Sequence, residues 1–226
     1  MVSEADFVKT LGLTRVMATD AKTLNIEVSN TNRPGMQFAN YWDFFPYERP
    51  QLLGKVEMTY LSQLDELTRR ERLAKYFNYP LPCIIICRGY PCFDEMLVLA
   101  MARKVPIYST KKETTQFELE LIAYLRDRLA PRETRHGVLV NVFGAGLLIT
   151  GNSGVGKSEA ALELVKRGHQ LVADDVVDIR RVEDNRLIGE SPELVRHFME
   201  IRGVGIIDVS TMYGAGAIMR SKHIDM

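Results

Sequence analysis

The chain has 226 residues, of which 46% are hydrophobic and 26% are charged, and its 29 basic and 29 acidic side chains give a formal net charge of zero. This length allows one large domain or two small ones, and the composition is typical of a globular protein. The balanced charge argues against nucleic acid as the main partner, because binding to a phosphate backbone normally requires a basic excess. No stretch approaches the roughly 18 apolar residues of a membrane span. The acidic start, residues 1–6, is unlike a secretory signal, so we expect a cytoplasmic protein without membrane contact.

The first half of the sequence alternates predicted helices and strands. Ser3 to Asp6 resembles a capping box that begins a short helix ending at Gly12. Further elements are expected in this order: a strand over 25–28, a turn over 32–35, helix from Leu53 to about Tyr76 with a break at 61–63, a strand over 81–87, a helix over 93–104, a strand over 105–108 and a helix over 114–129. This alternation indicates an α/β layer built around a largely parallel sheet.

Three cysteines, Cys83, Cys87 and Cys92, lie close together in this half. They suggest either a metal site or buried free thiols. We favour thiols, because no fourth ligand is in view and two of the cysteines flank the apolar run 84–86. An odd number of cysteines without a signal peptide fits a reducing cytoplasm.

A polar segment containing a proline, residues 130–135, follows the last helix of the first half. We place a domain boundary there, which divides the chain into domains 1–130 and 131–226. Two strands, 136–142 and 145–150, are expected next, joined by a tight turn at Phe143 and Gly144. A strand over 170–173 follows later, and the strands 177–180 and 186–189 are predicted to form a hairpin around the polar residues 183–185.

The run Gly151-Asn152-Ser153-Gly154-Val155-Gly156-Lys157-Ser158 matches the phosphate-binding P-loop pattern G-x-x-x-x-G-K-[ST]. An apolar run precedes it and a helix-forming segment, 159–167, follows it up to Gly168, so a chance match is disfavoured. The loop would direct backbone N–H groups and the positive end of a helix at one point. Lys157 would neutralise the charge of the β- and γ-phosphates, and the Ser158 hydroxyl would hold Mg²⁺. We therefore predict binding of a nucleoside triphosphate or pyrophosphate.

Two adjacent carboxylates, Asp174 and Asp175, close the strand that follows the P-loop helix. Adjacent residues at a strand end point in different directions, so one can serve the metal while the other accepts a proton from an acceptor hydroxyl. A solvated acidic turn is the alternative. His136 opens the strand pair that leads into the loop and could lie near the phosphates, although a lone histidine at a strand start more often has a structural role.

Residues 200–208 combine a carboxylate, an arginine and two glycines. Glu200 could ligate magnesium, and Arg202 could bind phosphate through two hydrogen bonds. A simple turn between two strands explains the same residues equally well.

Four runs together, in this order and approximate spacing, resemble the bacterial HPr kinase/phosphorylase family: His136–Val140, Gly151–Glu159, Leu171–Asp175 and Glu200–Ile207. The first half agrees in Asn32–Gly35, Tyr41–Pro46, Thr114-Thr115 and Arg128–Pro131, so the resemblance covers nearly the whole chain.

This resemblance implies an α/β fold, in which an N-terminal α/β domain precedes a P-loop kinase domain similar to the core of phosphoenolpyruvate carboxykinase. The family pattern continues beyond Met226 with an active-site arginine and helices that contact HPr, so we expect the C-terminal part of the kinase domain to be missing. Family members use ATP or pyrophosphate, with Mg²⁺, to phosphorylate a serine of the phosphocarrier protein HPr. They also remove this phosphate by attack of inorganic phosphate, regulate carbon catabolite repression and form homo-hexamers.

The resemblance also implies residue roles. Lys157 would bind the β- and γ-phosphates, while Ser158 and Glu200 would hold Mg²⁺. Asp175 would accept the proton of the serine and return it in the reverse reaction, with Asp174 assisting.

Two further roles follow from the same resemblance. His136 would lie at the phosphate site. Arg202 would act within the segment Met199–Asp208, which the family uses in both directions.

Two other interpretations stay open at this point. The first is a catalytically weak nucleotide-sensing module that regulates through binding alone. The second is a P-loop kinase for a small metabolite, which the glycine loop allows but the run 200–208 does not suggest.

Overall fold

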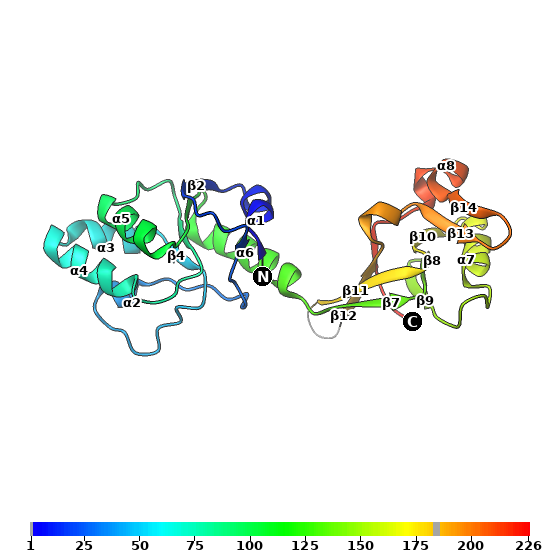
Figure 1. The fold of residues 1–226 in the computed structure, drawn as a ribbon, viewed down its shortest axis with the longest axis horizontal. Coiled ribbons are helices and arrows are strands. Elements are labelled where there is room, and N and C mark those ends of the chain that lie inside the picture. Colours follow the sequence, from blue (N-terminus) through cyan, green and yellow to red (C-terminus); the bar gives the residue numbers. More distant parts are fainter. Residues whose placement is uncertain (1, 183–185) are drawn as a thin grey trace. The chain divides into compact units, whose positions relative to one another are not determined.

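The computed structural model describes residues 2–182 and 186–226, so the centre of the predicted hairpin turn, 183–185, lies outside the described residues. The chain divides into two compact units, Met1–Leu129 (unit 1) and Ala130–Met226 (unit 2). Both units contain helices and strands (Figure 1), as the predicted α/β class requires. None of the helices within the described ranges has the length and apolar character of a membrane span.

Unit 1 is built on a four-stranded sheet with the order β2-β6-β5-β4. Its elements are β1 (Val2–Ser3), α1 (Glu4–Leu11), β2 (Thr14–Met17), β3 (Thr23–Leu24), α2 (Gly35–Phe38), β4 (Gln51–Leu53), α3 (Lys55–Gln63), α4 (Glu66–Tyr76), β5 (Ile84–Ile86), α5 (Asp94–Arg103), β6 (Ile107–Ser109) and α6 (Thr114–Leu129). β5 pairs in parallel with both β4 and β6, whereas β2 is antiparallel to β6. The predicted largely parallel sheet is therefore confirmed for this unit.

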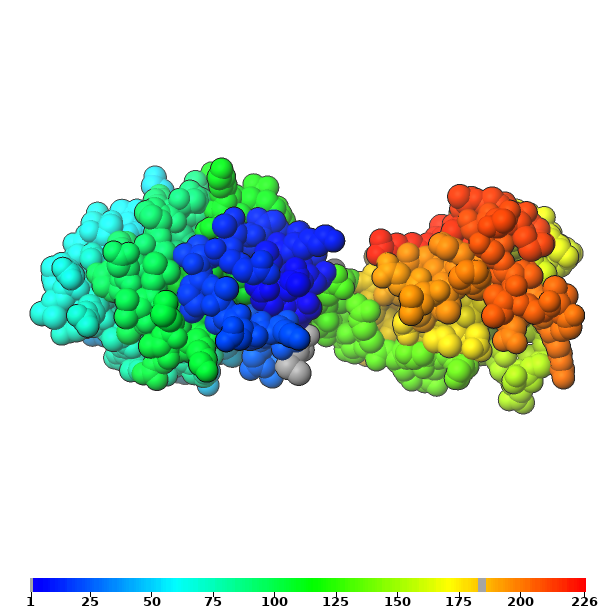
Figure 2. Space-filling model, turned by 45° about the horizontal axis from the view of Figure 1, so that its top comes forward, coloured from blue at the N-terminus to red at the C-terminus, as the bar shows by residue number. Residues whose placement is uncertain are grey.

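Helices cover both faces of this sheet because its central strands are apolar on both sides. Leu53 and Ile86 contribute to a core with α2 to α5, while Leu52, Ile85 and Tyr108 contribute to a second core with α1 and α6. Successive residues of a strand point to opposite faces, so two neighbouring leucines serve two different cores. In Figure 2 the dark blue segment that includes α1 forms part of the surface of unit 1.

Two local predictions for unit 1 are wrong, and a third is confirmed with small shifts in its bounds. Residues 25–28 run as an irregular segment, and the strand here is the shorter β3, which pairs with β1. The helical segment predicted from Leu53 to about Tyr76 is confirmed as α3 and α4, although β4 ends at Leu53 and the break lies at Leu64 and Asp65 rather than at 61–63. The side chain of Ser3 makes no capping hydrogen bond within the described residues.

The failed capping box has a physical reason. Asp6, its expected acidic member, accepts a hydrogen bond of 2.6 Å from Tyr124 Oη and pairs with Arg128 at 3.1 Å. These contacts to α6 hold the carboxylate away from the helix start and fix α1 on α6.

Unit 2 consists of short antiparallel sheets around one long helix. Its elements are β7 (Arg132–His136), β8 (Val138–Val142), β9 (Ala145–Ile149), α7 (Lys157–Lys166), β10 (Gln170–Ala173), β11 (Val176–Val182), β12 (Arg186–Glu190), η1 (Glu193–Val195), β13 (Phe198–Ile201), β14 (Gly205–Asp208), α8 (Val209–Tyr213), η2 (Ala215–Ala217) and β15 (Ser221–His223). The sheets have the orders β10-β8-β9, β15-β12-β11-β7 and β13-β14. Every pairing between these strands is antiparallel.

Several predicted elements of unit 2 are confirmed. β10 has the expected bounds, β11 and β12 form the expected hairpin, and Phe143 and Gly144 turn with positive φ angles of 49° and 88°. Residues 132–135 were not expected to form a strand, because β7 is exposed and polar throughout, and His136, expected to open the next strand, ends β7 instead. The strand conformation of β7 comes from pairing with β11, which no local pattern reveals.

Gly189 lies at the centre of the larger sheet of unit 2, where a methyl group has no space. A Cβ there would overlap Leu139 Cδ2 and lie 3.0 Å from Val177 Cγ1. Gly189→Ala is therefore expected to lower the free energy of unfolding by about 1–3 kcal/mol, measured by urea denaturation. Gly216→Ala is the control, since its Cβ would meet no described atom within 4 Å. Equal stability of the two variants would show that the sheet can shift to admit the methyl group.

Candidate active site

The glycine loop, residues 151–158, connects β9 to α7, and Figure 1 shows α7 in unit 2 next to β8 and β10. Gly154 and Gly156 have φ angles of 82° and 95°, a region that side chains with a Cβ rarely adopt. The loop folds back on itself, and Lys157 Nζ donates hydrogen bonds of 3.0 Å to the carbonyl oxygens of Gly151 and Asn152. The first N–H groups of α7 and one ammonium group therefore face the same small region, an arrangement suited to an anion.

The N-terminal end of α7 stays exposed, while the rest of the helix is anchored in the core. Ala161 and Val165 are buried against β8, β10 and β13, in a core that includes Val140 and Met199. The polar start of the helix is left at the surface, because only its later turns carry apolar residues toward the sheet.

Asp174 lies at the end of β10 and links two parts of the site. Its Oδ1 accepts a hydrogen bond of 2.8 Å from Ser158 Oγ, and its Oδ2 accepts one of 3.0 Å from Glu200 N. The side chain is only 8% exposed. Burial raises the pKa of the Asp174 carboxyl above its usual value, although the two hydrogen bonds act in the opposite direction.

Asp175 has a strained backbone and an exposed side chain. Its φ angle is 62°, and Val176 N donates a 2.7 Å hydrogen bond to Asp174 O, so Asp175 is the central residue of a γ-turn. This conformation costs about 1–3 kcal/mol for a residue with a side chain and is often found at functional sites. The turn directs the carboxylate outward, where it is 75% exposed and its Oδ1 lies 3.7 Å from His136 Nδ1.

The β13–β14 hairpin forms the third side of the site. Met199 and Ile201 point into the core, so Glu200 points to the exposed face between them. Arg202 lies in the turn and reaches the glycine loop, where its Nη1 would be 3.3 Å from a Cβ placed on Gly154. The run 200–208 is thus both a turn between two strands and a neighbour of the loop.

The structure brings together most of the residues that the sequence singled out. The sequence did not predict a hydrogen bond between Ser158 and Asp174, because it assigned Ser158 and Glu200 together as the ligands of the metal. Glu200 reaches Asp174 through its main chain. No group of three or more His, Cys, Asp or Glu side chains within the described residues is arranged to hold a metal ion. Ser158 and Asp174 still fit Mg²⁺, which usually takes one or two protein ligands in addition to phosphate oxygens and water.

A groove of about 990 Å³ adjoins this region in unit 2. Its lining includes His136 and Thr150, the residue before the glycine loop, together with Arg132, Arg135 and Arg181. Arg135 is paired with Glu133 and Arg132 with Glu190. The groove therefore has a wall with three arginines and one glutamate, and His136 lies in its lining.

The cysteines of unit 1 take no part in this site. All three are free, and Cys83 and Cys87 are buried, as predicted for thiols beside a core strand. Burial raises the pKa of Cys87 to about 11 and that of Cys92 to about 12, so both stay protonated at neutral pH.

Comparison with known proteins gives matches over both units. The sequence model described as "HPr Serine kinase N terminus" matches residues 2–125, and that described as "HPr Serine kinase C-terminal domain" matches residues 127–226. The HPr kinase/phosphorylase of Caldanaerobacter subterraneus subsp. tengcongensis is 46% identical over 225 residues, which cover 100% of this chain and 74% of the relative. That of Alkaliphilus metalliredigens is 47% identical over 218 residues, which cover 96% of this chain and 71% of the relative.

A solved structure, the Hpr(Ser) kinase/phosphatase from Coxiella burnetii, is 41% identical in sequence, with a TM-score of 0.39 over 41% of this chain and 55% of that chain. The two sequence models and the relatives agree with each other along the whole length of the chain. This chain therefore belongs to the HPr kinase/phosphorylase family.

Proposed function

We propose that this chain transfers phosphate from ATP, or from pyrophosphate, to a serine of HPr, and removes it again by phosphorolysis. The observation that carries the proposal is the hydrogen bond between Ser158 and Asp174, because it joins the glycine loop to the strand end that bears Asp175. The glycine loop, proposed to bind phosphate, is thereby held next to the strand end that the exposed Asp175 carboxylate follows. Relatives at 46–47% identity are named HPr kinase/phosphorylase.

In the forward direction the phosphate chain would lie on the glycine loop, with Lys157 and the N–H groups of α7 balancing its charge. The serine Oγ attacks the terminal phosphorus, its proton passes to Asp175, and the bond from phosphorus to the bridging oxygen breaks. Arg202, next to Gly154, would bind the transferred phosphate through its guanidinium group. His136 would orient the Asp175 carboxylate.

In the reverse direction an oxygen of inorganic phosphate attacks the phosphorus of phosphoserine. Asp175 takes the proton of the incoming phosphate and delivers it to the serine oxygen, which leaves as a hydroxyl, and the product is pyrophosphate. One residue in both proton transfers is what microscopic reversibility requires. The serine would approach Asp175 along the groove beside His136.

Mg²⁺ would be held by Ser158 and Asp174, and the Glu200 main chain is tied to the same aspartate. When bound, it neutralises phosphate charge and orients the phosphate chain. We further propose that unit 2 is a P-loop kinase domain, and that its similarity to the phosphoenolpyruvate carboxykinase core, a homo-hexameric assembly and a cytoplasmic location follow from family membership.

Magnesium binding should depend on the protonation of Asp174. The pKa of this carboxyl is raised by burial, so it keeps its proton to a higher pH than an ordinary aspartate, and a protonated carboxyl is a poor ligand. As pH falls through this pKa, each further unit should weaken Mg²⁺-dependent ATP binding by up to about tenfold. Calorimetric titration between about pH 4.5 and 7 tests this for the parent and for Asp174→Asn. ATP itself titrates in both proteins, so an identical pH dependence would exclude Asp174 as a ligand.

The proposed phosphorolysis is tested with HPr phosphorylated on serine, inorganic phosphate and Mg²⁺. Pyrophosphate should appear in step with the loss of phosphoserine, and omission of inorganic phosphate should stop both. Dephosphorylation without pyrophosphate would indicate hydrolysis by water instead. A chain that binds ATP but modifies HPr in neither direction would be a nucleotide-sensing module.

A further inference from the structure

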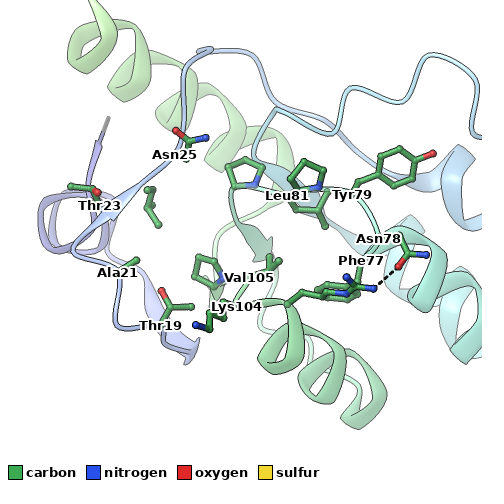
Figure 3. Close-up of a pocket in the computed structure, with 15 residues that line it drawn as sticks. Thr19, Ala21, Thr23, Asn25, Phe77, Asn78, Tyr79, Leu81, Lys104 and Val105 are labelled. Atoms are coloured by element: carbon green, nitrogen blue, oxygen red, sulfur yellow. Dashed lines mark hydrogen bonds between the residues drawn. The ribbon is translucent and has the colours of Figure 1, made fainter.

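Unit 1 contains a hollow of about 460 Å³ at the amino ends of β5 and β6. Ligand pockets in proteins usually have volumes of about 300–1,000 Å³, so a small molecule fits here. Figure 3 shows Thr19, Thr23 and Asn25 on one side of the hollow, with Leu81 and Val105 facing them from the other side. The described residues that line the hollow all belong to unit 1, and they include no residue of the candidate active site in unit 2.

The floor of the hollow is apolar. Leu24, Leu81 and Val105 are at most 6% exposed, and Pro82 and Pro106 are buried beside them. Proline has no N–H group, so this floor offers few backbone donors and favours an apolar ligand surface. The two central strands of the sheet, β5 and β6, are each preceded by a segment that contains a proline, and these two segments form the floor.

The rim of the hollow is polar and positively charged. Arg103 and Lys104 belong to it, whereas the described lining residues include no aspartate or glutamate. Arg103 Nη2 donates a 2.7 Å hydrogen bond to Asn78 Oδ1, which fixes the guanidinium group at the edge. Thr19 and Asn25 add a hydroxyl and an amide.

The C-terminus of α5 opposes an anion, since a helix C-terminus carries about half a negative charge. Two of its last carbonyl groups are already hydrogen-bonded, Ala100 O to Val105 N and Met101 O to Lys104 N. Two full positive charges on Arg103 and Lys104 exceed this partial charge. The charged side chains that line the hollow are therefore both positive.

We propose that this hollow binds a small organic anion, in which a carboxylate or phosphate group is attached to an apolar body. The anionic group contacts Lys104 and Arg103 at the rim, and the apolar body covers the floor formed by Leu81, Val105 and the prolines. Thr19 and Asn25 hydrogen-bond to polar atoms of the ligand. This site is separate from phosphate transfer and does not depend on it.

The test uses the full chain labelled with ¹⁵N and four probes: benzoate, phenyl phosphate, neutral benzyl alcohol and inorganic phosphate. Benzoate and phenyl phosphate should shift the amide signals of residues 19, 25 and 104 in a saturable way. Benzyl alcohol lacks the charge and inorganic phosphate lacks the apolar body, so each should bind these residues roughly fivefold more weakly or worse. A preference for one of the two organic anions identifies the acidic group of the ligand. Phosphate binding at the glycine loop is recognised separately by shifts at 151–158.

Lys104→Asn removes the charge and suits the local backbone, because Lys104 has a φ angle of 56°, which asparagine tolerates well. It should weaken the binding of both organic anions roughly fivefold. Lys111→Asn, also in unit 1 and outside the lining, should leave binding unchanged. The proposal is overturned if the rim amides stay unmoved up to about 10 mM of either organic anion, if benzyl alcohol binds equally well, or if Lys104→Asn binds like the parent.

Discussion

Lys157→Ala is expected to lower the rate of phosphate transfer to HPr by about a thousandfold. The Lys157 ammonium group is the positive side chain held within the glycine loop, through its hydrogen bonds to Gly151 O and Asn152 O. Phosphoryl transfer depends mainly on positioning and charge neutralisation, so the loss of this group removes stabilisation of the transition state. Rates are measured under saturating HPr with quantified phosphoserine.

The matched control is Lys166→Ala, which removes an exposed lysine from the other end of the same helix. Its transfer rate should equal that of the parent. Thermal unfolding of both variants should stay close to that of the parent, because neither side chain belongs to the core. A Lys157→Ala protein with more than about a tenth of the parent rate would show that phosphate does not lie on this loop.

Asp175→Asn is expected to lower transfer in both directions by between about a hundredfold and ten-thousandfold. The amide cannot accept the serine proton, whereas asparagine keeps the size of the side chain and suits the φ angle of 62° at this position. The fold should therefore persist, with the free energy of unfolding changed by no more than about 0.5 kcal/mol. Nucleotide binding should also persist, because Asp175 contacts the acceptor side.

Asp178→Asn serves as the control, since Asp178 is a nearby carboxylate on β11 whose partner is Thr134 at 2.7 Å. It should transfer phosphate at the parent rate. If Asp175→Asn impaired only one direction, a single residue could not carry the proton both ways. If it impaired neither, another group would have to act as the base.

Much of the fold could be predicted because its signals are local. α6 spans residues 114–129 as expected, and β10 ends before two aspartates as expected. Where a strand depends on a distant partner, the local pattern fails. β4 is paired with β5 and was not predicted as a strand, and β7 is polar throughout and held by β11. The antiparallel sheets of unit 2 also depend on such pairings.

The sequence predicted which residues belong to the candidate site, but it did not predict which of them contact each other. The glycine loop and the adjacent aspartates are recognisable because phosphate binding requires particular residues at a fixed spacing. The γ-turn at Asp175 and the hydrogen bond from Ser158 to Asp174 arise from tertiary packing. Arg202 reaches Gly154 because the β13–β14 hairpin folds over the loop. The sequence of 200–208 was equally compatible with a simple turn and with a phosphate contact, so it did not predict this contact.

The most direct test of the proposed function is transfer of label from γ-³²P-ATP and Mg²⁺ to purified HPr by this chain. We expect label on a serine of HPr, with no label above background when Lys157→Ala replaces the parent. Tight ATP binding by the parent without labelled HPr would contradict the proposed transfer reaction and favour a nucleotide-sensing role.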